Sequence, residues 1–447
     1  MEFIIKISQF LLSLSFLIVL HELGHFIPAK LFKTRVEKFY LFFDVKYSLF
    51  KKKIGETVYG IGWLPLGGYV KISGMIDESM DTEQMQQEPQ PWEFRSKPSW
   101  QRLIIMLGGV TVNFLIALVV YIVMAFVYGS FDVDAKSVRG GYLIKNDVLR
   151  EIGLQNGDKI LAINDNEIVN FSDIKRYILE TETMTIDRQG SVENIAFPRN
   201  FLGQLSGSKS KGLVDFRTPI IFDRFSEGSI NSALDIRTGD VFVSIDGKPA
   251  QFQDELVPLL EGIKGQKVEL VVRRNGTTLS QPIQVTDDGK LEFYYTTLMS
   301  DFESAGFFKS FRKEYNFNES IAAGSKRFVN QISSYWTQLK LIFSPSTGAY
   351  KGVGGFKAIF DVFPDTWSWE SFWNITAFLS IMLAVLNLLP IPALDGGHVM
   401  FLLYEMISGR KPGDKFMEYA QTVGFFILIA LVLFANGNDI FKALFGQ

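Results

Sequence analysis

Three residues with the spacing of a metal site interrupt an apolar stretch near the N-terminus. His21, Glu22 and His25 form an H-E-x-x-H sequence (HELGH) directly after the run FIIKISQFLLSLSFLIVL. On a helix the two imidazoles lie one turn apart on the same face, so both can bind one zinc ion, while Glu22 can accept a proton from a water that the metal activates. Ionisable residues in an apolar helix are costly and usually functional. A structural histidine pair would need polar partners that the run Leu11–Leu20 does not supply.

A hydrolytic zinc site usually has three protein ligands and one position for water. The chain has no Cys and three His, so the third ligand is His398, an Asp or a Glu. The segment Asn387–His398 (NLLPIPALDGGH) ends an apolar stretch, where Pro390 and Pro392 break the helix and two glycines permit a tight turn. Irregular backbone at membrane depth is tolerated where it lines a cavity or is buried in protein. Asp395 and His398 are the two candidates, and an ordinary helix-end turn is the alternative.

These residues lie in two of four apolar stretches, which reach from Phe3 to Phe26, from Leu103 to Tyr128, from Phe372 to Leu389 and from Val423 to Phe434, the last with a softer lead-in from Phe416. About twenty apolar residues span a bilayer core of ~30 Å, and the fourth stretch is short. A signal peptide is the alternative for the first stretch, but no small-residue cleavage site follows Leu20. The sequence predicts a multi-pass α-helical membrane protein with four transmembrane helices.

Basic residues predict the orientation of these helices. Lys and Arg are frequent between the first two stretches, and Arg410, Lys411 and Lys415 lie between the last two. The positive-inside rule places both links in the cytoplasm. The termini and the long segment 130–370 are therefore expected on the opposite side.

Within this long segment, two stretches about eighty residues apart repeat one pattern. GLQNGDKILAINDNEI begins at Gly153 and LDIRTGDVFVSIDGKPA at Leu234. Each has a Gly-Asp turn, an alternating apolar strand and an Asn-Asp or Asp-Gly hairpin turn. The pattern resembles PDZ domains in tandem, and a hairpin duplicated by chance is the alternative. An amphipathic helical pattern follows them.

Three features together resemble the site-2 protease family, and more narrowly its bacterial RseP-type intramembrane metalloproteases. They are HELGH in the first apolar stretch, LDGG at the end of the third and the PDZ-like pair between them. The resemblance implies Zn²⁺ as cofactor and Asp395 as the third ligand, with His398 behind the ligands. It also implies a bacterial inner membrane, with the active site near the cytoplasmic side and the PDZ-like domains on the periplasmic side. Expected substrates are single-span transmembrane proteins, such as anti-sigma factors, or remnant signal peptides, after trimming by an upstream site-1 protease.

The resemblance extends to residues expected to contact substrate. GIGWLPLGGYVKISG, residues 60–74, resembles the membrane-associated β-loop of the family, whose Gly-rich edge strand could hold an unwound substrate by strand addition; a plain hairpin is the alternative. Its candidate residues are Leu66, Gly67, Gly68 and Tyr69.

Two asparagines are further substrate-binding candidates, and Asn113 or Asn387 could also stabilise an oxyanion. The family usually has Gly-Pro-x-x-Asn where this chain reads Gly109-Val110-Thr111-Val112-Asn113, so the kink expected from Pro is in question. For both asparagines the alternative is a buried amide that bonds a neighbouring helix.

The expected division of the chain is eight segments: 1–33 (first transmembrane helix), 34–100 (cytoplasmic-side β-loop region), 101–129 (second transmembrane helix), 130–215 and 216–300 (PDZ-like domains), 301–370 (extracytoplasmic amphipathic helical region), 371–400 (third transmembrane helix with LDGG) and 401–447 (link and fourth transmembrane helix). The PDZ-like pair could bind new C-termini or act as a size filter. The poorly formed carboxylate-binding glycines at Gly140-Gly141 favour the filter.

Composition narrows the function classes. A net charge of −3 gives no electrostatic basis for a nucleic-acid partner. The absence of Cys excludes disulfides, thiol nucleophiles and Cys zinc sites. Two classes remain: a zinc endopeptidase of regulated intramembrane proteolysis, and a non-catalytic membrane scaffold or transporter subunit that binds partners through the PDZ-like pair. The intact HELGH and LDGG sequences favour the enzyme.

Overall fold

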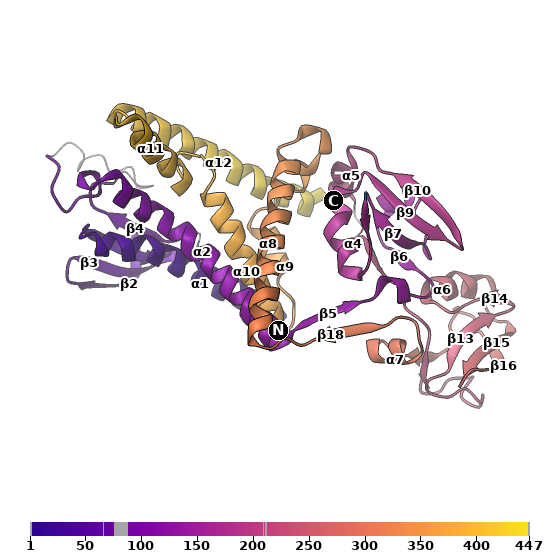
Figure 1. The fold of residues 1–447 in the computed structure, drawn as a ribbon. Coiled ribbons are helices and arrows are strands. Elements are labelled where there is room, and N and C mark those ends of the chain that lie inside the picture. The colour runs from indigo at the N-terminus through magenta and orange to yellow at the C-terminus, as the bar shows by residue number, and fades with distance from the viewer. Residues whose placement is uncertain (1, 66, 76–87, 209, 211, 446–447) are drawn as a thin grey trace. The chain divides into compact units, whose positions relative to one another are not determined.

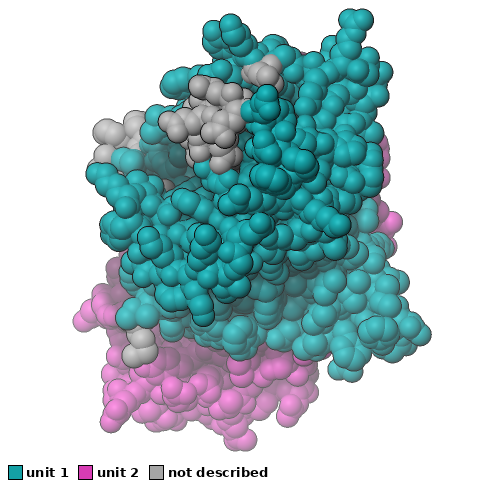
Figure 2. Space-filling model, turned by 90° about the vertical axis from the view of Figure 1, so that its left-hand side faces the viewer, with its two compact units in different colours: residues 1–129, 314–343, 353–447 teal, residues 130–313, 344–352 magenta. Residues whose placement is uncertain are grey.

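The computed structural model describes residues 2–65, 67–75, 88–208, 210 and 212–445, and the chain divides into two compact units (Figures 1 and 2). Unit 1 comprises Met1–Gly129, Glu314–Phe343 and Val353–Gln447. Unit 2 comprises Ser130–Lys313 and Ser344–Gly352. Each unit is described by itself below.

Unit 1 is mainly helical. Its helices are α1 (Glu2–Leu31), α2 (Ser99–Tyr128), α8 (Phe317–Ile342), α9 (Phe356–Val362), α10 (Trp369–Asn387), α11 (Asp395–Ser408) and α12 (Asp414–Phe445). In the described part of the chain, four helical segments are long and apolar enough to cross a membrane: Glu2–Leu31, Ser99–Tyr128, Trp369–Asn387 and Lys415–Ile440. The short fourth apolar stretch of the sequence thus belongs to a longer helix.

Helices α1 and α2 touch backbone to backbone at glycines. A Cβ atom on Gly24 would lie 2.4 Å from the Gly108 carbonyl oxygen, and one on Gly108 would lie 1.9 Å from the Gly24 carbonyl oxygen. Small residues allow such close approach of helices where water does not drive their association. Helix α2 continues as one element from Ser99 to Tyr128 through Val110, the position at which the family usually has Pro.

The connection from α10 to α11 is a tight turn that leaves no room for side chains at two positions. A Cβ on Gly396 would lie 2.3 Å from the Leu389 carbonyl oxygen, and one on Gly397 would lie 2.4 Å from Pro392 Cα. Helix α11 then begins at Asp395. Because the helix dipole is positive at its N-terminus, this is a favourable position for a carboxylate.

Helix α8 packs against α2 and α10 and so belongs to unit 1. Gly324 lies against the backbone of Ile122. One apolar cluster joins the three helices through Ala117, Tyr121, Tyr335, Leu339, Ala377, Ile381 and Val385. The expected amphipathic region 301–370 is therefore divided between the units, since α7 (Met299–Ser304) and β18 (Ser310–Lys313) lie in unit 2.

A four-stranded sheet of order β2-β3-β1-β4 follows α1 in unit 1. Its strands are β1 (Val36–Leu41), β2 (Phe43–Ile54), β3 (Thr57–Leu64) and β4 (Tyr69–Ile72). Strand β1 pairs parallel with β3 and antiparallel with β4, with Tyr40 opposite Tyr69. Strand β4 lies at an edge of this sheet and pairs with β1. Leu66 lies outside the described residues.

Unit 2 holds two β-modules built on the same plan. The first module contains β6 (Tyr142–Ile144), α3 (Asp147–Glu151), β7 (Lys159–Ile163), β8 (Asn166–Glu167), α4 (Phe171–Tyr177), β9 (Thr183–Arg188), β10 (Ser191–Ala196), α5 (Phe201–Gly207) and β11 (Val214–Phe216). The second module contains β12 (Phe222–Phe225), β13 (Val241–Ile245), β14 (Lys248–Pro249), α6 (Gln253–Gly262), β15 (Lys267–Arg274), β16 (Thr277–Gln284) and β17 (Phe293–Tyr295). The sheets run β8-β7-β9-β10 and β14-β13-β15-β16, and the pairs β6–β11 and β12–β17 complete the modules. Strand β5 (Ser130–Val133) pairs with β18.

The Gly-Asp turns of the sequence occupy equivalent places in the two modules. Tyr142 donates its N–H to the Asp158 carbonyl oxygen at 2.9 Å, and Phe222 donates to the Asp240 carbonyl oxygen at 2.8 Å. The side chains of Asp158 and Asp240 are each about 1% exposed and paired with an arginine. The repeat in sequence is therefore a repeat in three dimensions. Each module has its own main apolar cluster, and Val241 and Phe252 of the second module pack into the cluster of the first.

Candidate metal centre

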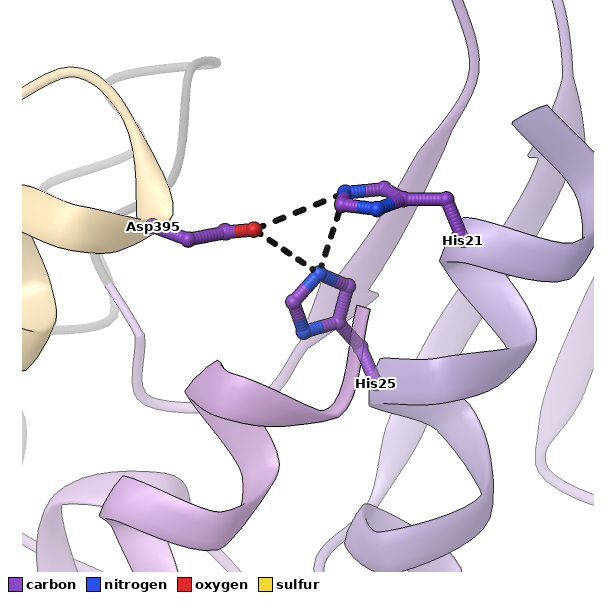
Figure 3. A group of neighbouring side chains, drawn as sticks. All are labelled: His21, His25 and Asp395. Atoms are coloured by element: carbon purple, nitrogen blue, oxygen red, sulfur yellow. Dashed lines mark hydrogen bonds and ion pairs between the residues drawn. The ribbon is translucent and has the colours of Figure 1, made fainter. Parts of the chain in front are cut away.

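Three potential ligand atoms converge in unit 1 from two helices that are distant in sequence (Figure 3). His21 and His25 project from α1, and Asp395 projects toward them from the first turn of α11. The two Nε2 atoms are 3.3 Å apart. Asp395 Oδ2 lies 3.5 Å from His21 Nε2 and 3.3 Å from His25 Nε2.

This triangle has the size that a tetrahedral zinc site requires. Ligands at ~2.0–2.1 Å from a tetrahedral ion are ~3.4 Å from one another, which matches the three observed distances. Within the described part of the chain, Asp395 Oδ2 is buried and has no hydrogen-bond donor. A buried carboxylate oxygen without a donor, facing two imidazoles, fits a cation, and two histidines with one carboxylate are a known zinc donor set.

Helix α2 lies behind the two imidazoles and sets their orientation. His25 Nδ1 lies 2.8 Å from the Ile105 carbonyl oxygen, and because a carbonyl only accepts, this nitrogen carries the proton. His21 Nδ1 lies 3.1 Å from the side-chain amide of Asn113. Both rings therefore turn Nε2 toward Asp395, as a histidine does when its other nitrogen is held by a neighbouring group.

Gly109 provides the space that the rings occupy. A Cβ atom there would lie 2.4 Å from His25 Nε2 and 2.6 Å from His21 Cε1. The sequence prediction did not single out Gly109 or the Ile105 carbonyl as parts of the site. Gly109 could have been found from the adjacent glycines in Leu107-Gly108-Gly109, which are unusual within an apolar helix. The Ile105 carbonyl could not have been found, because a backbone carbonyl has no signal in the sequence.

The remaining candidates lie at different distances from the triad. Glu22 is near enough to His25 for their charges to interact, and a Cβ on Gly68 would be 3.7 Å from Glu22 Cγ. Asn387 Nδ2 lies 3.3 Å from His21 Nε2, on the side of the ring that faces Asp395. His398 is not one of the three converging residues, since its Nε2 lies 2.9 Å from the amide of Gln421 on α12.

Gly67 and Gly68 are pressed against their neighbours at the start of β4. A Cβ on Gly67 would lie 2.8 Å from the Phe43 ring, and one on Gly68 would lie 2.6 Å from Ile18 of α1. The Tyr69 hydroxyl donates to Asp44 Oδ1 at 2.8 Å, and its ring stacks on Tyr40. The side chain of Tyr69 is thus held within the sheet.

Apolar membrane-length helices and a His-His-Asp group beside a glutamate define a membrane-integral zinc metalloprotease. Comparison with known proteins gives the same result: residues 9–431 match Peptidase family M50, the site-2 protease family, and the chain belongs to this family. Zinc is its cofactor.

Similar proteins align over nearly their whole length, and their names assign zinc metalloprotease activity without demonstrating it. The relative from Campylobacter jejuni is 29% identical over 96% of this chain and 91% of its own length. The relative from Borreliella burgdorferi is 28% identical over 96% of each chain. The relative from Rickettsia conorii is 27% identical over 98% of each chain.

Proposed function

We propose that the protein is an intramembrane endopeptidase that cleaves single-span transmembrane substrates, with zinc held by His21, His25 and Asp395. The observation that carries this proposal is the triangle of ligand atoms on a helix long and apolar enough to cross a membrane. When bound, zinc supplies Lewis-acid chemistry that activates water and polarises a peptide carbonyl. Three protein ligands would leave a position on the ion for water or substrate.

The chain's own residues would carry out the proton transfers. Glu22 follows His21 directly and is the proposed general base, accepting a proton from the attacking water and returning it to the leaving amine. Asn387 lies on the same side of His21 as Asp395. From there its amide can donate a hydrogen bond to a substrate carbonyl.

The edge strand β4 is the proposed site for the substrate backbone. A helix in lipid satisfies its peptide groups internally, so it must unwind before cleavage, and its freed N–H and C=O groups need new partners. Strand β4 lies at the edge of its sheet, and Gly68, directly before it, adjoins Glu22 and Ile18. Gly67, Gly68 and Tyr69 would act through their backbones, by strand addition.

The substrate class follows the same proposal. Anti-sigma factor-like proteins and remnant signal peptides, already trimmed by a site-1 protease, have one membrane span and little outside it. The two β-modules are proposed to be PDZ-like domains on the periplasmic side of a bacterial inner membrane that exclude untrimmed substrates. Four transmembrane helices would then place the metal near the cytoplasmic face, in keeping with the basic links.

The test is a Glu22→Gln variant of the full chain in membranes, with a photocrosslinker at the β4 edge and a Glu370→Gln variant as the control, because Glu370 is exposed at the start of α10. We expect Glu22→Gln to retain zinc, lose cleavage and accumulate crosslinks to transmembrane peptides, whereas Glu370→Gln cleaves normally. Normal cleavage by Glu22→Gln would refute the assignment of the base. Zinc retention after His25→Ala would refute the proposed metal site.

A further inference from the structure

One face of α2 contacts the two imidazoles of α1 at successive helical turns. Ile105, Gly109 and Asn113 are spaced four apart and so lie on one face of the helix. His25 contacts Ile105 and His21 contacts Asn113, while Gly109 lies against both rings. The two histidines therefore have equivalent neighbours at successive turns of α2.

The two contacts differ in which part of α2 supplies them. For His25 the partner is a backbone carbonyl, which any residue at position 105 would provide. For His21 the partner is the side-chain amide of Asn113, which is fully buried. A histidine that binds metal through Nε2 keeps its proton on Nδ1 and needs an acceptor there. The amide atom nearest His21 Nδ1 is Asn113 Nδ2, while the buried Asn113 Oδ1 has no hydrogen-bond partner among the described residues. A half-turn of the amide exchanges the two atoms and presents the oxygen to the Nδ1 proton.

The two asparagines near His21 occupy opposite sides of the ring. Asn113 lies at Nδ1, 3.1 Å away, and Asn387 lies at Nε2, 3.3 Å away. Only the Nε2 side faces Asp395. A substrate carbonyl approaching the metal would meet Asn387, whereas the imidazole of His21 lies between the metal position and Asn113.

We propose that Asn113 is a positioning residue: it accepts the Nδ1 proton of His21 and so keeps Nε2 directed at the metal, without contacting substrate. This inference rests on the proposed metal site. The backbone of Gly109 on α2 also lies near the His21 ring. Removing the Asn113 amide should therefore weaken zinc binding rather than abolish it.

The variants that test this proposal distinguish an Asn113 side chain that accepts a hydrogen bond from His21 from one that donates a hydrogen bond to substrate. Asn113→Asp keeps an oxygen facing Nδ1 but has no amide N–H to offer a substrate. Asn113→Leu has similar size and offers neither. Ser13→Ala is the matched control, because Ser13 is a fully buried polar residue on α1 whose hydroxyl bonds Thr376 at 2.9 Å, away from the rings.

The measurement is Zn²⁺ affinity of the purified full chain, by competition with a chelator, together with the KM and kcat of the zinc-saturated protein on a transmembrane peptide. We expect Asn113→Leu to weaken zinc binding about 10–100-fold, the usual effect of losing a partner of a metal ligand. Asn113→Asp and Ser13→Ala should stay within about threefold of the wild type. At saturating zinc, the KM of Asn113→Asp should equal that of the wild type.

Two results would overturn the inference. One is zinc affinity in Asn113→Leu equal to that of the wild type. The other is an Asn113→Asp variant with normal zinc affinity and a raised KM, since that pattern marks an amide that binds substrate. If Asn113→Leu does not fold, Asn113→Asp alone decides between acceptor and substrate contact. If His21→Ala also binds zinc normally, the proposed metal site itself has failed.

Discussion

The candidate metal centre and each of the two β-modules contain an aspartate with a buried carboxylate oxygen, but the groups around this oxygen differ. Asp158 receives two hydrogen bonds of 2.8 Å from Arg188 and one of 2.8 Å from the Gln155 N–H. Asp240 has the equivalent bonds from its own arginine and turn. Asp395 Oδ2, by contrast, has no hydrogen-bond donor among the described residues and faces two imidazoles.

This difference separates the structural carboxylates of the modules from the proposed metal ligand. A buried charge is stable in a fold when donors surround it, as in the Gly-Asp turns. A carboxylate left with an unpaired oxygen costs free energy, and the fold tolerates it where a cation completes the site. Among these three aspartates, burial therefore does not distinguish the proposed ligand, whereas the absence of hydrogen-bond donors in the described part of the chain does.

The largest expected effect comes from replacing the carboxylate of Asp395. Asp395→Asn removes the negative charge from the triangle, so we expect cleavage below detection and less than about one-tenth of the wild-type zinc content at equal free zinc. The zinc-free variant should unfold at the same temperature as the zinc-free wild type or higher, because it no longer buries a carboxylate oxygen that lacks hydrogen-bond donors. Zinc content by mass spectrometry and thermal unfolding in detergent test this. A variant that loses its fold but keeps its zinc would show that Asp395 is a structural carboxylate and not a metal ligand.

The next largest effect is expected when the space beside the two imidazoles is filled. Gly109→Ala would place a methyl group 2.4 Å from His25 Nε2, and we expect a loss of zinc nearly as complete as in Asp395→Asn. Gly437→Ala on α12 is the control, because a Cβ there meets nothing within 4 Å. Zinc content and cleavage of a transmembrane peptide measure the difference. Equal zinc content in the two variants would show that the rings are not confined by α2.

The sequence indicated which side chains converge at the candidate site, His21, His25 and Asp395, but not what surrounds them. HELGH and LDGG carry a signal because metal binding demands particular side chains at fixed spacing. The Ile105 carbonyl carries none, since every residue has one. The packing of α8 was not foreseen either: its pattern is amphipathic, but Gly324 against Ile122 is a contact between distant segments that periodicity does not reveal.

For the two β-modules of unit 2, the sequence predicted the local structure around the turns better than it predicted the surroundings of the candidate metal centre. The Gly-Asp turns and hairpin turns are local, so the sequence predicted two similar units from them, and both sheets have the same strand order. The arginines that neutralise the buried aspartates were not identified, because Arg188 and Arg274 follow at 30 and 34 residues from their partners. Local sequence patterns allow prediction, whereas ion pairs between residues that only the fold brings together cannot be predicted from them.

The paired carboxylates of the modules should give a smaller and different effect. Asp158→Asn or Asp240→Asn weakens charge-assisted hydrogen bonds, so we expect local opening of the affected module to increase by roughly tenfold or more. Zinc content and cleavage of a short transmembrane peptide should not change. Hydrogen exchange of the full chain measures the opening, and Asp165→Asn, at an exposed hairpin turn, is the control. Loss of zinc in either variant would contradict the structural role of these pairs.

Asp44 provides the finest test, because it lies in the sheet beside the centre but has donors. It accepts from the Tyr69 hydroxyl at 2.8 Å and from Ser48 at 3.4 Å, and Lys38 lies 3.9 Å away. If the presence of donors rather than nearness to the metal decides the role, Asp44→Asn keeps its zinc and changes the kcat and KM of cleavage by less than about threefold. The Asn side chain still accepts from Tyr69, so β4 should hold its position. A zinc loss comparable to that of Asp395→Asn would mean that nearness decides, and the distinction drawn from Asp158 and Asp240 would not extend to the metal centre.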